Sequence, residues 1–189
     1  NTAATAITLH DTLIQTNGGT GHGSGAVGNG GNILIQDPLV LATGAVELNT
    51  GTGTTAGNIT TSSTINGAQA LTLTHGSGTL SLGGIVGGGT ALTGLTFNAN
   101  AVTLSTNITT NNGDVDINAP VTLGGDITIT TANGDIDFSS AINGTQSLTL
   151  SSGTGAIALQ GAIGADAILT ALSINATDGA TGTIEINNI

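Results

Sequence analysis

Residues 113–159 read GDVDINAPVTLGGDITITTANGDIDFSSAINGTQSLTLSSGTGAIAL, and apolar positions return in this stretch every 21 residues, as at Val115, Ile136 and Ile157. A fixed step of this kind is expected when a chain winds into coils that stack in register, because like residues then lie over like residues. The step of 21 therefore predicts a solenoid. The other columns are Ile117, Phe138 and Leu159; Val121, Ile142 and Ile163; Ile127 and Leu148; Ile129 and Leu150; and, earlier in the chain, Ile59 and Leu80 with Ile65 and Val86.

A longer repeat contains these columns. Residues 57–98 return without a gap as residues 134–175, an offset of 77. We therefore treat residues 1–189 as a single elongated body, with one full repeat at 57–133 and most of a second copy at 134–189. Dividing the repeat into whole coils predicts four coils of about 19 residues, within the range of solenoid repeats. Residues 17–30 have no counterpart in the later copy and are predicted to form a Gly-rich protruding loop.

The local pattern predicts short strands throughout. Val, Ile or Leu alternates with Thr, Ser, Asn or Asp, and Asn-Gly or Gly-Gly pairs separate the runs. No segment carries a helical stripe. The prediction is an all-β parallel β-helix of about nine coils of roughly 19–21 residues, forming a rod about 40–45 Å long. A β-sandwich of antiparallel hairpins is the alternative, but it does not require side chains to recur at one step in several columns.

Composition excludes several classes of partner. The chain has no Lys or Arg and a formal net charge of −11. Nucleic acid is excluded because no cation is present to neutralise phosphates, and anionic membrane surfaces are excluded for the same reason. Without Cys there is neither a disulfide nor a thiolate metal site. No apolar run is long enough to insert in a membrane. The first residue is Asn1 rather than Met, so we expect a fragment of a longer chain.

The repeat resembles a known family. The motifs Gly57-Asn-Ile-Thr60, Ile65-Asn-Gly67 and Gly113-Asp-Val-Asp-Ile-Asn-Ala-Pro-Val-Thr-Leu123 are similar to the repeats of filamentous-haemagglutinin-like bacterial exoproteins. This group comprises adhesins of two-partner secretion and giant β-strand-repeat surface proteins. The resemblance covers nearly the whole chain and is weakest over residues 10–30. It implies a right-handed β-helix, secretion to the bacterial cell surface, and a role in adhesion or surface fibres.

Four carboxylates are predicted to form an acidic patch. Asp114 and Asp116 alternate with inward residues and so face outward, and Asp135 and Asp137 lie one step of 21 later. Oxygen-rich clusters attract Ca²⁺, so these four residues are the candidate calcium ligands. The competing interpretation is a solvated acidic face that salt screens. No other cofactor is predicted.

The remaining motifs carry no chemistry. His10, His22 and His75 have no second His or carboxylate at ligand spacing, and we expect exposed turn histidines. Residues 23–28 fit GxGxxG formally, but neither the preceding strand nor the following helix of a dinucleotide site is predicted. Four Asn-x-Thr sequons, at Asn58, Asn107, Asn143 and Asn175, are expected from composition alone. No catalytic constellation is present, so we predict that the protein is not an enzyme.

The sequence therefore predicts a structural, extracellular β-helix segment. Its expected partners are further copies of itself, end to end in filaments, or adjacent repeats of a longer chain. An exposed strand edge at the end of a β-helix is a template for such pairing. The alternative function is an adhesin module that binds surface glycans through the 17–30 loop or the outward polar rows.

Overall fold

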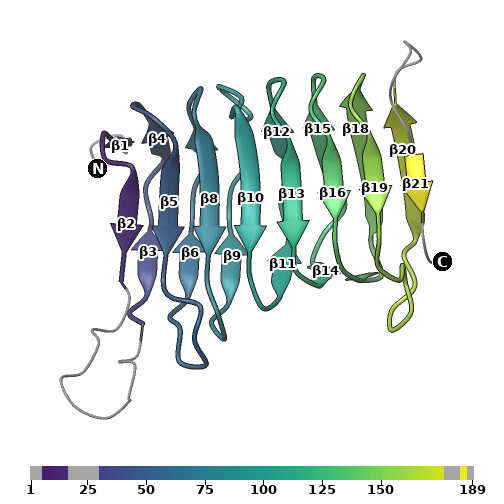
Figure 1. Ribbon diagram of the computed structural model, residues 1–189, viewed down its shortest axis with the longest axis horizontal. Helices are drawn as coiled ribbons and strands as arrows, with labels where there is room; N and C mark the ends of the chain where they lie inside the picture. Colours follow the sequence, from purple (N-terminus) through teal and green to yellow (C-terminus); the bar gives the residue numbers. More distant parts are fainter. Residues whose placement is uncertain (1–5, 17–29, 177–183, 187–189) are drawn as a thin grey trace.

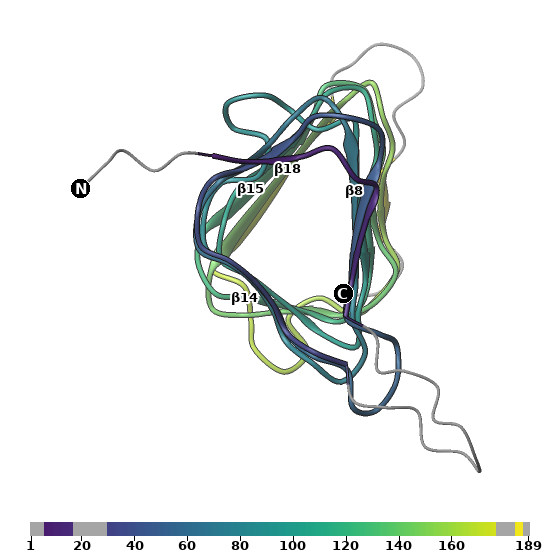
Figure 2. The same ribbon diagram turned by 90° about the vertical axis from the view of Figure 1, so that its left-hand side faces the viewer.

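The computed structural model describes residues 6–16, 30–176 and 184–186. In these residues the chain is all β and contains no helix. Short strands stack side by side along one axis (Figure 1). Viewed along that axis, the coils outline a triangle, and the chain runs clockwise as it recedes from the viewer (Figure 2). The fold is therefore a right-handed parallel β-solenoid with three faces, as the sequence predicts.

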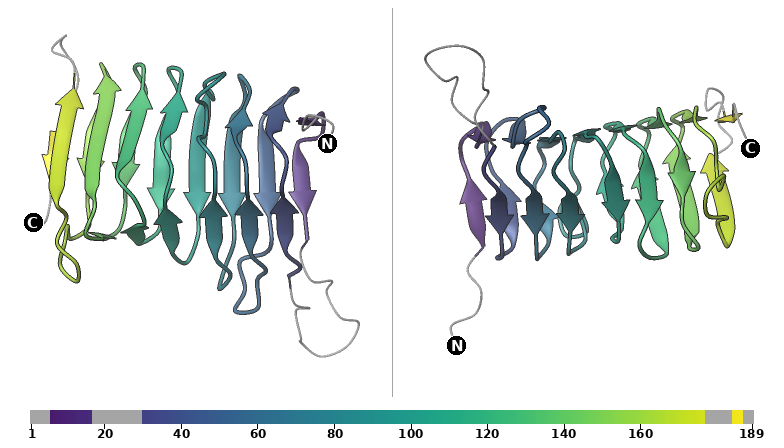
Figure 3. Two further views of the ribbon diagram at one scale, coloured as in Figure 1. Left: turned by 180° about the vertical axis from the view of Figure 1, so that it is seen from behind. Right: turned by 90° about the horizontal axis from the view of Figure 1, so that it is seen from below.

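Each face is a parallel sheet. We number the faces I to III in the cyclic order in which the chain crosses them, starting from β2. Figure 3 shows that the strands continue along the whole rod on the far side as well. Face I holds β2 (Leu13–Gln15), β5 (Val46–Asn49), β8 (Ala70–Thr74), β10 (Gly94–Asn98), β13 (Val115–Asn118), β16 (Ile136–Phe138), β19 (Ile157–Leu159) and β21 (Ile184–Ile186).

Faces II and III complete the triangle. Isolated bridges from Val86 to Ile65 and to Ile108 join the two parts of face III into one row. Face II holds β3 (Ile33–Ile35), β6 (Ile59–Thr61), β9 (Leu80–Leu82), β11 (Val102–Leu104), β14 (Val121–Leu123) and β17 (Ile142–Asn143). Face III holds β1 (Ile7–Leu9), β4 (Leu39–Leu41) and β7 (Ile65–Asn66), then β12 (Ile108–Thr110), β15 (Ile127–Thr131), β18 (Ser147–Gly153) and β20 (Ala171–Ala176).

The strand register confirms the columns seen in the sequence. Val115 pairs with Ile136, and Ile136 pairs with Ile157. Every other predicted column is also a pair of neighbours in a ladder or a bridge. All these pairings are parallel, which excludes the antiparallel sandwich. The expected nine coils are too many: the described residues make about six to seven turns, since face II holds six strands and face I holds eight.

The 77-residue repeat is not a whole number of coils. Ile59 begins β6 on face II, but its equivalent Ile136 begins β16 on face I. Leu71 likewise lies on face I and its equivalent Leu148 on face III. The chain crosses eleven faces between Ile59 and Ile136, so the repeat spans 3⅔ turns at seven residues per face and 21 per turn. The expected four coils of about 19 residues are wrong, because the two copies are rotated by one face.

The core is a set of aliphatic ladders. Inward residues of the strands in the body of the rod are buried, and outward ones are half-buried or exposed, as the alternation requires. Phe97 and Phe138 are fully buried and lie in one ladder of face I, separated by Ile117. Burying these side chains is the main favourable term in the stability of such a stack, at about 25 cal/mol per Å² of apolar surface.

Buried hydroxyl groups fix the corner between faces III and I. The Thr110 hydroxyl donates to the Gly113 carbonyl at 2.6 Å, and the Ser152 hydroxyl donates to the Gly155 carbonyl at 2.7 Å. Thr131 makes the same bond to Gly134 in the coil between them. The glycines are required because a Cβ on Gly134 would lie 2.2 Å from the Gly113 carbonyl oxygen below it. Each corner therefore combines a buried hydroxyl with a glycine three residues later.

Side-chain oxygens of Asn and Asp join successive coils where the backbone ladders are interrupted. The Asn66 side-chain oxygen accepts the backbone N–H groups of Gly89 at 2.7 Å and Thr90 at 3.1 Å in the next coil. Asn143, one repeat later, accepts those of Asp166 and Ala167 in the same way. The oxygens of Asn32, Asn58, Asn107, Asp114, Asp126 and Asp135 each accept one backbone N–H of the next coil.

Replacing Thr61 by Val should stabilise the protein. The Thr61 hydroxyl is buried in β6 without a hydrogen-bond partner, and its ladder neighbours are Ile35 and Leu82. Removing an unsatisfied hydroxyl at constant volume should raise the free energy of unfolding by about 1 kcal/mol. Thr50→Val is the matched control, because the buried Thr50 hydroxyl donates to the Gly57 carbonyl at 2.8 Å and its loss should cost about 1 kcal/mol. Urea unfolding measures both, and destabilisation by Thr61→Val would contradict the assignment.

Replacing Asn66 by Ala should destabilise the stack. Two backbone N–H groups lose their acceptor, and because both are near solvent we expect a loss of about 0.5–1.5 kcal/mol in the free energy of unfolding. The control is Asn111→Ala, since the exposed Asn111 amide oxygen accepts only from the side chain of Asn112. That change should stay within about 0.5 kcal/mol. Equal effects of the two substitutions on the urea midpoint would show that the inter-coil bonds contribute nothing.

Candidate functional site

The four aspartates predicted as calcium ligands lie together on and beside face I. Asp116 in β13 and Asp137 in β16 are ladder neighbours that face outward. Asp114 and Asp135 precede these strands and stack on each other, with the Asp114 carboxylate accepting the Asp135 backbone N–H at 2.9 Å. The Asp135 carboxylate in turn accepts the backbone N–H of Ala156 at 2.7 Å. Two of the four carboxylates therefore already serve as bonds between coils.

The crowding of these carboxylates changes their acidity. Partial burial raises the pKa of Asp116, and the charge of Asp114 raises it further, while a hydrogen bond from the Thr96 hydroxyl partly offsets both. Burial also raises the pKa of Asp137, and the charges of Asp116, Asp135 and Asp114 add to it. Among the described residues, no three His, Cys, Asp or Glu side chains converge as the ligands of one metal ion would. The calcium site at these four aspartates stays a prediction.

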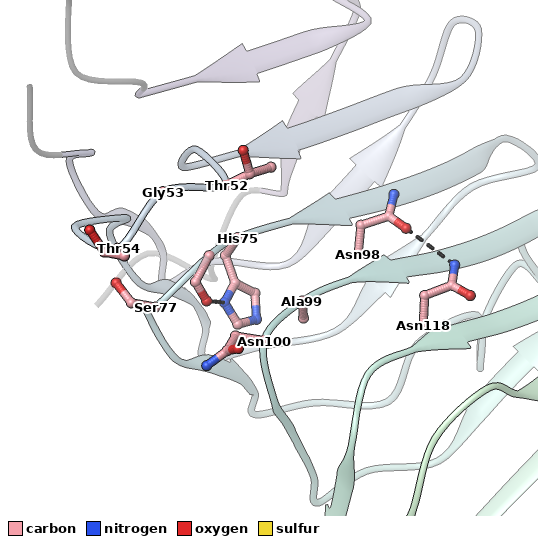
Figure 4. A pocket seen from close by; sticks show the side chains of 10 residues that line it. Thr52, Gly53, Thr54, His75, Ser77, Asn98, Ala99, Asn100 and Asn118 are labelled. Carbon is pink, nitrogen blue, oxygen red and sulfur yellow. Dashed lines mark hydrogen bonds between the residues drawn. The ribbon is translucent and has the colours of Figure 1, made fainter. Parts of the chain in front are cut away.

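A pocket lies at the corner between faces I and II. The turn at this corner shortens from coil to coil: residues 50–58 connect β5 to β6, 75–79 connect β8 to β9, 99–101 connect β10 to β11, and 119–120 connect β13 to β14. The longest turn therefore projects beyond its shorter neighbours. The resulting pocket has a volume of about 460 Å³ and is lined by Thr52, Gly53, Thr54, His75, Gly76, Ser77, Asn98, Ala99, Asn100 and Asn118 (Figure 4).

His75 forms part of this pocket and is buried, with 2 % of its surface exposed. The expectation of an exposed turn histidine is wrong for His75, because its side chain takes the place of a corner hydroxyl. Its repeat equivalent, Ser152, is fully buried and donates to Gly155. Asn49 pairs with Thr74, and the Thr50 backbone N–H donates to the Thr74 carbonyl, so Thr50 and His75 lie at the same corner in successive coils. His10 is exposed as expected, and His22 lies outside the described residues.

One nitrogen of the His75 imidazole has no hydrogen-bond partner. Its Nδ1 lies 3.2 Å from the Gly76 carbonyl oxygen, whereas its Nε2 is buried and has no hydrogen-bond partner. Burial lowers the pKa of His75 below its usual value of 6.5, and hydrogen bonds to the Gly76 and Gly78 backbone oppose that shift. The side chain is therefore neutral at pH 7. The sequence held one signal of this site: a histidine stands where the other copy has an inward serine.

The rim of the pocket is polar and uncharged. Thr52, Thr54, Ser77, Asn98, Asn100 and Asn118 are all exposed and present hydroxyl or amide groups. The Asn118 amide nitrogen donates to the Asn98 amide oxygen at 3.2 Å (Figure 4). That bond leaves the Asn98 nitrogen as a donor and the Asn118 oxygen as an acceptor, side by side on two successive coils.

Three of the four asparagines in the Asn-x-Thr sequons have a structural role in the stack. The side-chain oxygens of Asn58, Asn107 and Asn143 accept backbone N–H groups of the next coil. The fourth, Asn175, is exposed in β20. The segment that fits GxGxxG, residues 23–28, lies outside the described residues, as does nearly all of the loop predicted at 17–30.

Comparison with protein-family models, curated proteins and solved structures finds no match to this chain. No helix of the described residues is long and apolar enough to cross a membrane. The identification of this chain thus goes as far as its architecture, a parallel β-solenoid.

The carboxylates of Asp116 and Asp137 should destabilise the folded chain less as the pH falls from neutral toward 3.8. Because their pKa values lie above the usual 3.8 in the fold, the folded state takes up protons that the unfolded chain does not yet bind. His75 acts in the opposite direction, because its lowered pKa means that the unfolded chain binds the imidazole proton first. Thermal unfolding at fixed ionic strength, compared at each pH between the wild type and Asp116→Asn, separates the carboxylates from His75, which both chains share.

Asp116→Asn tests the cause of this pH dependence. It should raise the melting temperature at neutral pH and flatten the pH profile, since one of the crowded charges is gone. Asp37→Asn is the control, because it removes the same charge from an exposed turn between β3 and β4. Equal effects of the two substitutions at every pH would overturn the explanation.

Proposed function

We propose that this chain is a structural segment of a secreted bacterial surface protein, in which it forms part of a stalk or fibre. The observation that carries the proposal is the continuous stack itself. Ladders on all three faces run from the first described coil to the last. A stack of this kind extends in one direction only and gains length with each added coil, which suits a protein that spans distance.

The two ends of the stack are complementary. Within the described residues, β2 and β21 have a neighbouring strand on one side only and so present open edges. Wherever an Asn or Asp side-chain oxygen accepts a backbone N–H from a neighbouring coil, that N–H belongs to the following coil. Further coils, whether from the same chain or from another copy, would continue this pattern head to tail. Such heterologous contacts generate filaments.

The cellular setting rests on the sequence. The repeats resemble those of filamentous-haemagglutinin-like exoproteins, which supports an extracellular location and a surface role. A net charge of −11 without any Lys or Arg favours separate rods over lateral bundles, because like-charged surfaces repel. The fold and the charge are both compatible with a surface fibre.

End-to-end growth can be tested by electron microscopy and light scattering on the purified chain. We expect rods of variable length, in multiples of the length of one chain, and a mass that rises with protein concentration. Rods of one fixed length at every concentration would overturn self-assembly.

A pair of lysine substitutions locates the contact. Ser173 lies exposed on β20, the last strand of face III, and pairs with Thr149 on β18. Ser173→Lys should shorten the filaments because a charged side chain on an edge strand blocks further pairing. Thr149→Lys places the same charge in the same column on an interior strand and should leave filament length unchanged. Equal effects would place the contact elsewhere.

A further inference from the structure

The Asn-Gly pairs of the rod differ in how firmly the fold holds them. The described residues contain four complete pairs, at residues 66–67, 112–113, 133–134 and 143–144. Asn is a chemically labile residue, and it is most labile before glycine, because a residue without a side chain lets its backbone nitrogen approach the Asn side chain. The dipeptide is the same in all four pairs, so the fold decides which of them can react.

Two of the pairs are locked by backbone groups. The Asn66 side-chain oxygen accepts two backbone N–H groups of the next coil, and the Gly67 N–H donates to the Thr90 carbonyl at 3.1 Å. Asn143 is held in the same way, and the Gly144 N–H donates to a carbonyl of the next coil at 3.1 Å. In both pairs the backbone of another coil holds the glycine nitrogen and the amide beside it.

The other two pairs lie at the corner between faces III and I and have no such lock. In the described part of the chain the N–H groups of Gly113 and Gly134 donate no hydrogen bond. The Asn112 and Asn133 side chains are exposed and bond only to other side chains. The Asn133 amide nitrogen donates to the Asn112 oxygen at 2.6 Å, and the Thr154 hydroxyl donates to the Asn133 oxygen at 2.9 Å.

Asn112 is the more reactive of these two residues for two reasons. Its φ of 61° is the one positive φ of a non-glycine residue in the described chain, and this region is costly for a residue with a side chain. Less is therefore lost when the backbone leaves this conformation to bring the reacting atoms together. Gly113 is also half-buried whereas Gly134 is buried, so base and water reach the Gly113 nitrogen more readily.

We propose that Asn112-Gly113 is a site of spontaneous covalent modification, at which Asn112 becomes aspartate or isoaspartate, with Asn133-Gly134 as the slower second site. The Gly113 nitrogen attacks the Asn112 side-chain carbon, a C–N bond closes a five-membered succinimide, and the side-chain nitrogen leaves as ammonia with the Gly113 proton. Water then opens either C–N bond of the ring. The net reaction consumes one water, releases one ammonia and leaves one carboxylate.

Each conversion adds a negative charge to a corner that is already acidic. Asn112 and Asn133 stand two residues before Asp114 and Asp135, and the chain has no Lys or Arg to balance the new charge. The Asn133 amide can still donate to a carboxylate at position 112, so the first conversion preserves the bond between the coils. A second conversion would place two carboxylates in contact, which disfavours the charged form of both.

The experiment incubates the whole folded chain in oxygen-18-labelled water at mildly alkaline pH, where the Gly113 N–H loses its proton more readily. Pepsin digestion and mass spectrometry then locate the label, since the chain has no Lys or Arg for trypsin to cut. We expect label at position 112 first and at position 133 later. Asn66 and Asn143 should convert at least about tenfold more slowly than Asn112, because their amides and glycine N–H groups must first leave their backbone partners.

A parallel sample unfolded in urea separates the fold from the dipeptide. There the four pairs should convert at similar rates, because none of them is held. Asn112→Gly is the matched variant, since glycine adopts a positive φ freely and has no amide to lose. In this variant the first acidic species that ion-exchange chromatography separates from the incubated folded chain should be missing.

Three results would overturn the proposal. The first is equal conversion of the four pairs in the folded chain. The second is an unchanged Asn112 after a time in which the urea sample converts at this position. The third is the same first acidic species from Asn112→Gly as from the wild type.

Discussion

Parallel backbone pairing between successive coils is the interaction on which this structure depends. Each coil supplies three short strands that are too small to be stable alone, and each ladder places the same type of residue above itself one turn later. Once that register is set, inward positions must be apolar and of similar size, as the run from Val115 to Ile136 to Ile157 shows. Core, rod shape and directionality all follow from it.

The unit that repeats physically is the face, of about seven residues. Because all three faces share one pattern, a repeat need not contain whole turns, and the 77-residue copies are rotated by one face without disturbing the stack. The Asn58 equivalent, Asp135, makes the same inter-coil bond from a different corner. Any segment of complete faces could be duplicated in the same way, which explains how a long rod grows from a short sequence pattern.

The sequence was sufficient for the ladders because they depend on side-chain periodicity, which is visible in one chain. It predicted the columns through Ile117 and Val121 correctly. It also contained the rotation of the copies, since an offset of 77 residues is 3⅔ steps of 21, but the prediction of four whole coils ignored that fraction. Nor did it predict the burial of His75: a polar residue in a Gly-rich turn looks exposed until the corner hydroxyls of Thr50 and Ser152 show that this position points inward.

The corners are where this fold has freedom to vary. A strand residue is constrained by its neighbours above and below, whereas a corner can lengthen outward without breaking a ladder, as residues 50–58 do beside the shorter turns 75–79 and 99–101. Such a difference in length leaves a recess beside the longer turn. The residue at the base of this recess, His75, occupies the buried corner position that carries a hydroxyl in other coils. An imidazole there bonds through Nδ1 to the carbonyl of the next residue, Gly76, and its Nε2 is buried without a partner. A recess can therefore arise on the side of the rod when one turn is longer than its neighbours, with the ladders unchanged.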